Sequence, residues 1–79
     1  MNECTVVGFR AVSFKDQKTG QMIEGTTLYL YGPDPDGKVT GYIAEKVFIS
    51  PAVEYTPKLQ DKIILRYNKY GKVRAIETI

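Results

Sequence analysis

The sequence contains no histidine, no tryptophan and a single cysteine, Cys4. The usual zinc sites and intramolecular disulfides are therefore excluded. Without histidine, a general base would have to be a carboxylate, and no nucleophile and base stand out together. There is also no run of about 20 apolar residues that could cross a bilayer. We expect a non-catalytic protein with no metal, no other cofactor, no small-molecule substrate and no place in a membrane.

The start and the length of the chain narrow its class further. The chain opens with Asn2 and Glu3 rather than with an apolar signal core, so we expect a cytoplasmic protein. Cys4 begins an apolar segment and is expected to be a small buried residue. The 79 residues form one domain, 1–79. A domain of this size buries only about 60% of its unfolded surface. Because neither a disulfide nor a metal supplements this core, we expect a homodimer.

The acidic residues of the Pro33–Gly37 segment could be taken for a cation-binding site, but we interpret them as turn formers. Asp34 and Asp36 flank Pro35. Two carboxylates are few for calcium, which takes six to eight oxygen ligands. Aspartates in a segment rich in proline and glycine are ordinary turn formers.

The chain reads as strands separated by turn signals, and no stretch has convincing helical periodicity. The expected strands are Cys4–Phe14, Gln21–Tyr31, Val39–Ser50, Ile63–Tyr67 and Lys72–Glu77. Five antiparallel strands in so short a chain, the first of them long and bent, predict an all-β fold. The architecture expected is a small five-stranded OB-like Greek-key barrel. An SH3-like barrel is the alternative, and the two differ in the order in which their strands pair.

Four glycines carry local predictions. Gly8 lies where the first strand can bend or bulge, and Gly25 marks a possible bulge in the second. Gly20 is expected in the left-handed region at the end of a polar turn. Gly71 is expected at positive φ in the turn of the closing hairpin.

The second strand alternates leucine with tyrosine. In an antiparallel sheet with one packed face, Leu28 and Leu30 should point inward and Tyr29 and Tyr31 outward.

The distribution of the basic residues matters more than their number. The net charge is +2 and the sequence pI about 8.7, which is only mildly basic. Arg10 interrupts an apolar strand, where a guanidinium must find an anion or extend to solvent. The other cations of interest lie in two turns and two strands: Lys15, Lys18, Lys46, Arg66, Lys69 and Lys72. The alternative is that such lysines only keep the protein soluble and protect strand edges, which suffices for Lys38 and Lys58.

Tyrosines accompany these cations. Tyr29, Tyr31, Tyr42 and Tyr70 are candidates for stacking on unpaired bases, which contributes about 1–3 kcal/mol per base. The alternative is that a tyrosine covers the edge of the core and keeps its hydroxyl in water.

Three stretches resemble the small single-stranded-DNA-binding proteins of filamentous phages, the gene V type. They are the basic turn Lys15–Gly20, the strand Thr27–Tyr31, and Tyr55-Thr56-Pro57 followed by a strand and the turn Lys69-Tyr70-Gly71. The resemblance implies a five-stranded OB-like barrel that dimerises and coats single strands without strong sequence preference. The acidic loop Pro33–Gly37 departs from the family, in which a DNA-contacting hairpin is expected there.

Carried to matching positions, the resemblance implies a groove of basic and aromatic residues. Some candidates come from this resemblance and others from the charge and aromatic character of the residues. Together they are Arg10, Lys15, Lys18, Tyr29, Tyr31, Tyr42, Lys46, Arg66, Lys69, Tyr70 and Lys72. We predict single-stranded DNA binding in phage, plasmid or mobile-element replication or transfer. One alternative is an RNA-binding small β-barrel, because both nucleic acids offer phosphates and stackable bases. The other is a protein-interaction subunit that uses a strand edge.

Overall fold

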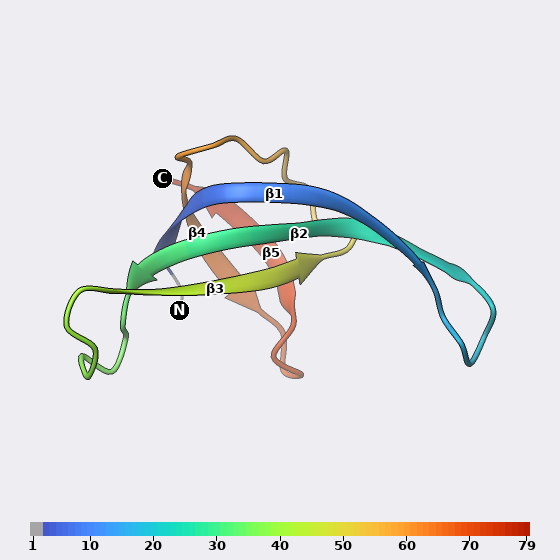
Figure 1. The fold of residues 1–79 in the computed structure, drawn as a ribbon, viewed down its shortest axis with the longest axis horizontal. Coiled ribbons are helices and arrows are strands. Elements are labelled where there is room, and N and C mark those ends of the chain that lie inside the picture. The colour runs from blue at the N-terminus through green and yellow to red at the C-terminus, as the bar shows by residue number, and fades with distance from the viewer. Residues whose placement is uncertain (1–2) are drawn as a thin grey trace.

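The computed structural model describes residues 3–79 as five antiparallel strands in one sheet (Figure 1). They are β1 (Glu3–Lys15), β2 (Met22–Pro33), β3 (Tyr42–Ile49), β4 (Lys62–Tyr67) and β5 (Val73–Thr78). Within this range no helix is long and apolar enough to cross a membrane. Asn2, on which the expectation of a missing signal sequence partly rests, lies outside the described residues, as does Met1. The predicted all-β fold is confirmed.

The strand order β3-β2-β1-β4-β5 places β1 at the centre of the sheet. β1 pairs with β2 from Thr5 to Lys15, and with β4 only from Glu3 to Thr5. The sheet curls so that β4 and β5 cross behind β1, β2 and β3, as Figure 1 shows. β3 and β5 approach each other without pairing, so the barrel is not closed. This arrangement is the partly open, OB-like one.

The curl depends on a bulge in β1. The pairing register with β2 shifts between Val6 and Gly8, so one extra residue bends the strand where Gly8 was predicted to allow it. Gly20 and Gly71 take the expected positive φ, 74° and 79°. The prediction for Gly25 is wrong, because the register of β2 runs past it without a shift on the β1 side.

One cluster of buried side chains fills the space between the two layers. Its members come from every strand but β5: Cys4, Val6, Leu28, Leu30, Ile49, Val53, Ile63 and Leu65. The predicted burial of Cys4 and of both leucines of β2 is confirmed. Ile76 of β5 packs against this cluster, as do Tyr67 and Val73, and so holds the closing hairpin to the core.

The β2–β3 connection is longer than predicted, since β3 begins at Tyr42 rather than Val39. Asp34 organises this loop by accepting the backbone N–H groups of Asp36, Lys38 and Val39, each at 3.0 Å. These hydrogen bonds, that from Asp36 first, lower the pKa of the Asp34 carboxyl. Its interpretation as a turn former is confirmed. The other strand bounds agree with the prediction to within two residues.

The far part of the β1–β2 hairpin, residues 11–25, projects as an arm. Beyond Arg10 and Thr26 these two strands pair only with each other. The arm stretches the molecule to 43 × 24 × 18 Å and its radius of gyration to 13.5 Å, against about 12 Å for a compact domain of this length. Figure 1 shows the arm extending well past β4 and β5.

Candidate nucleic-acid interface

The three-stranded layer β1–β2–β3 has one side turned away from the core, which we call the outer face. Because Leu28 and Leu30 point inward, the alternating Tyr29 and Tyr31 point outward. Residues directly paired across antiparallel strands share a face. The outward positions are therefore Thr5, Gly8 and Arg10 on β1, Thr27, Tyr29 and Tyr31 on β2, and Tyr42, Ala44, Lys46 and Phe48 on β3. None of these positions carries a carboxylate. Glu3, however, alternates with the buried Cys4 on β1 and so also points outward, and it lines a hollow together with Tyr31 and Tyr42.

Aromatic rings meet at one end of the outer face. The rings of Tyr31 and Tyr42 lie 5.3 Å apart, centroid to centroid, with their planes at 68°. Tyr42 is 69% exposed, so this edge-to-face pair leaves one ring largely open to solvent. Tyr29 lies further along β2, directly opposite Lys46 of β3. The Lys46 side chain and the Tyr29 ring therefore lie on the same face as the Tyr31–Tyr42 pair.

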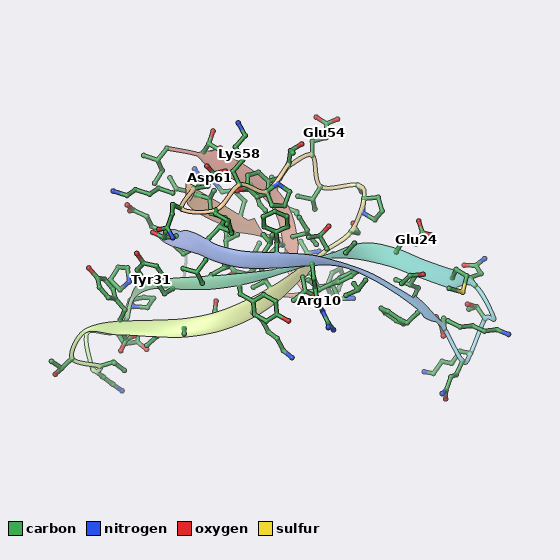
Figure 2. All side chains as sticks on the ribbon, turned by 45° about the horizontal axis from the view of Figure 1, so that its top comes forward. Arg10, Glu24, Tyr31, Glu54, Lys58 and Asp61 are labelled. Atoms are coloured by element: carbon green, nitrogen blue, oxygen red, sulfur yellow. The ribbon has the colours of Figure 1, made fainter. Side chains whose placement is uncertain are left out.

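Arg10 is the second cation of the outer face. It pairs with Thr27 of β2, whose neighbour on β3 is Phe48. Figure 2 shows Arg10 extending from β1 away from the side that carries Glu24 and Glu54. Among the described residues its guanidinium makes no ion pair or hydrogen bond, and its side chain is exposed. Of the two alternatives expected for this arginine, an anion or solvent, the structure shows the second.

The turn of the arm carries Lys15 and Lys18. Asp16 shapes this turn, since its carboxylate accepts the N–H of Lys18 at 2.8 Å and its carbonyl accepts the N–H of Gly20 at 2.7 Å. Asp16 is thereby occupied with the backbone, and both lysines remain exposed.

The β4–β5 turn carries Lys69, Tyr70 and Lys72. Asn68 builds it by accepting the N–H groups of Tyr70 and Lys72 at 2.9 and 3.0 Å. The Nζ atom of Lys69 lies 5.2 Å from the ring centroid of Tyr70, a cation–π distance. A hollow of about 540 Å³ separates this turn from β3; it is lined by Val47, Phe48, Ser50, Tyr67, Gly71, Lys72 and Val73. The turn therefore borders the outer face along the free edge of β3.

Arg66 is the predicted site residue that the structure does not bring to this face. It alternates with the buried Leu65 and so points away from the core on the other layer. Its guanidinium lies 3.1 Å from the Glu77 carboxylate, an exposed pair that adds little stability.

Two phenylalanines of the outer face were not singled out from the sequence. The rings of Phe14 and Phe48 lie 6.4 Å apart at 63°, and both are substantially exposed. Phe48 follows Val47 and precedes Ile49, so it resembles a core residue in the sequence. The available signal is its spacing, since it shares the parity of Tyr42 and Lys46 on one strand.

The Phe48 ring packs so close to position 25 that only glycine fits there without a shift of its neighbours. A Cβ atom at this position would collide with the Phe48 ring and with the carbonyl oxygen of Ile49. We expect Gly25→Ala to displace Phe48 and to destabilise the β2–β3 pairing by roughly 1–3 kcal/mol, the usual cost of overpacking. Chemical denaturation measures this loss, with Gly8→Ala as the control, because Gly8 has no positive φ and a Cβ there would make only ordinary contacts, with the Tyr29 side chain at 3.7 and 3.8 Å. Equal stability losses in the two variants would mean that the collision with Phe48 and Ile49 is not what disfavours a side chain at position 25.

The titratable groups of the core offer no reactive site. Burial raises the pKa of the Cys4 thiol to about 11, and the nearby Glu45 adds to the shift. Burial also raises the pKa of Tyr55 to about 12, supported by the hydrogen bond that its hydroxyl donates to Asp61 at 2.8 Å. A thiol of such high pKa stays protonated and unreactive at neutral pH. Within residues 3–79, no three histidine, cysteine or acidic side chains gather to hold a metal ion.

Comparisons of the chain with protein-family models, with curated proteins and with solved structures find no match in any of the three. The resemblance to the gene V type therefore stays a prediction.

Proposed function

We propose that this protein binds single-stranded DNA without strong sequence preference and has no catalytic activity. The observation that supports the proposal is the composition of the outer face. It combines Arg10 and Lys46 with tyrosine and phenylalanine rings, and among the described residues of β1, β2 and β3 the one acidic side chain that points outward is Glu3, at the start of β1. Nucleic acid offers a partner for both kinds of side chain, since phosphates attract the cations and bases stack on the rings.

The location of this surface fits the proposal. OB folds bind oligonucleotides on the face of strands 2 and 3 and with the β1–β2 and β4–β5 loops. In this chain the Lys15–Lys18 turn and the Lys69–Lys72 turn occupy those loops, and the tyrosines lie on the face of β2 and β3. The backbone of a bound strand would follow the cations, while its bases lie on the rings.

The setting of this activity follows from the resemblance to the gene V type. We propose a homodimer that acts in the cytoplasm during phage, plasmid or mobile-element replication or transfer. The free edges of β3 and β5 support self-association, because an unpaired strand edge readily pairs with another chain.

Fluorescence anisotropy with labelled oligo(dT), a matched RNA and a matched duplex tests the proposal. We expect binding to oligo(dT) whose log affinity falls with log salt by about 0.7 per phosphate neutralised. Lys69→Ala combined with Lys72→Ala should make this slope shallower by about 1.4, since two contacts are lost. Lys58→Ala should leave this slope unchanged, because the Lys58 side chain lies on the side of the molecule away from Arg10 in Figure 2.

Three results would change the proposal. No binding to oligo(dT) at low salt would refute it. Tighter binding to the matched RNA would favour the RNA-binding alternative, because only RNA offers the 2′-hydroxyl. An unchanged slope in the Lys69 and Lys72 double variant would remove the β4–β5 turn from the site.

A further inference from the structure

The outer face contains a second aromatic site at the base of the arm, well apart from the tyrosine pair. A hollow of about 600 Å³ lies there, lined by Arg10, Ala11, Val12, Ser13, Phe14, Thr27 and Phe48. Its two phenylalanine rings form the edge-to-face pair at 6.4 Å and stay 50% and 41% exposed. A hollow with two half-open rings has the apolar lining that a flat apolar group requires.

Three features indicate that this hollow is built for a ligand. The Phe48 ring occupies the space above Gly25 that any side chain there would fill. Arg10 lines the hollow, and among the described residues its guanidinium has no ion pair or hydrogen bond. The other polar groups of the lining are the Ser13 and Thr27 hydroxyls, so no carboxylate opposes an anion. Rings together with a free guanidinium suit a stacked base and its phosphate.

The distance to the tyrosine pair follows from the register of β3. Tyr42 and Phe48 lie six residues apart on one continuous strand, which corresponds to about 20 Å. Tyr29 and Lys46 occupy the outer face between them. A single nucleotide cannot contact both ends, whereas a strand of several nucleotides can.

We propose that Arg10, Phe14 and Phe48 form a second base-stacking station, separate from the Tyr31–Tyr42 station, and that one DNA strand occupies both. This inference rests on the proposed function and deepens it, because it assigns the strand two anchoring points and a minimum length. Arg10 binds the phosphate beside the base that stacks on the exposed face of a phenylalanine ring.

The affinity for oligo(dT) as a function of length tests this arrangement. We expect affinity to rise steeply up to the length that reaches both stations and to level off beyond it. Phe14→Leu and Phe48→Leu keep apolar bulk but remove the π face. Each should weaken binding of long strands by roughly 5- to 150-fold, the equivalent of about 1–3 kcal/mol per stacked base. Binding of the shortest strands should change by less than about twofold, because they still occupy the tyrosine station.

Phe9→Leu is the matched control. Phe9 lies on the same strand and is 44% exposed, but it pairs with Leu28 and so points to the inner side. The Phe9→Leu variant should bind DNA strands of every length with the affinity of the wild type. Thermal melting of each variant identifies any loss of folding, and Phe14 belongs to the arm outside the core, so Phe14→Leu is expected to stay folded.

The possible outcomes distinguish failure of the second stacking station from failure of the proposed DNA binding. Wild-type affinity at every length in both Phe14→Leu and Phe48→Leu would overturn the station while leaving DNA binding intact. Equal losses at all lengths would also overturn it, because a single continuous site would then be at work. Absence of binding by the wild type at any length would instead refute the proposed function.

Discussion

Replacing both Arg10 and Lys46 by glutamate is expected to reduce the affinity for oligo(dT) by about 100- to 1,000-fold at low salt. A pair of unit charges 4 Å apart interacts with about 1 kcal/mol even in bulk water. Each reversal exchanges an attraction for a repulsion of similar size, so two reversals amount to about 4 kcal/mol before screening. Both side chains are exposed on outward positions, and the fold does not depend on their charge. Anisotropy titrations at two salt concentrations measure the loss.

A matched comparison separates local contacts from total charge. Lys46→Glu and Lys58→Glu each change the charge by two units and take the formal value from +2 to 0. Only Lys46 lies on the outer face, so Lys46→Glu should weaken binding at least tenfold more than Lys58→Glu. Equal losses would show that net charge alone controls binding and would refute the outer face as the interface.

Leu28→Ala is expected to remove a large part of the domain's free energy of unfolding. Leu28 is 0% exposed and pairs with Phe9 on β1 and Val47 on β3, at the middle of the three-stranded layer. Leucine-to-alanine changes in a core cost about 2–5 kcal/mol. Typical stabilities of 0.05–0.15 kcal/mol per residue give a chain of this length only about 4–12 kcal/mol in total. Urea denaturation followed by circular dichroism measures the difference.

Leu59→Ala is the control for this prediction. Leu59 is the same residue type but is 63% exposed in the connection before β4. Its replacement should change the free energy of unfolding by less than about 0.5 kcal/mol, as for most surface substitutions. Similar losses in the two variants would contradict the assignment of Leu28 to the centre of the core.

Local chemistry made much of the fold predictable. The leucine–tyrosine alternation of β2 identifies its inner and outer sides, and Gly20 and Gly71 identify two turns. These signals lie within a few residues of one another, so they need no knowledge of the tertiary structure. The start of β3 was misplaced because Val39 has high strand propensity, whereas the Asp34 carboxylate binds its N–H group within the loop.

The candidate site depended more on long-range pairing. Tyr29, Tyr31 and Tyr42 were chosen by residue type, but only the register of β2 with β3 shows that they share a face. Phe48 escaped notice because its neighbours Val47 and Ile49 are apolar, and Gly25 was misinterpreted because the ring above it comes from another strand. Arg66 was chosen for its neighbours in the sequence, whereas the curl of the sheet turns it to the other layer. Such contacts between distant segments leave no local pattern.

The segregation of charge on the sheet has a kinetic consequence. Among the described outward positions of the three paired strands, Arg10 and Lys46 are accompanied by a single carboxylate, that of Glu3, while Glu24 and Glu54 extend on the other side (Figure 2). A polyanion therefore attracts one side of the molecule more strongly than the other, and the protein turns its outer face toward the strand before contact. Such steering speeds productive encounters at low ionic strength and fades as salt screens the field.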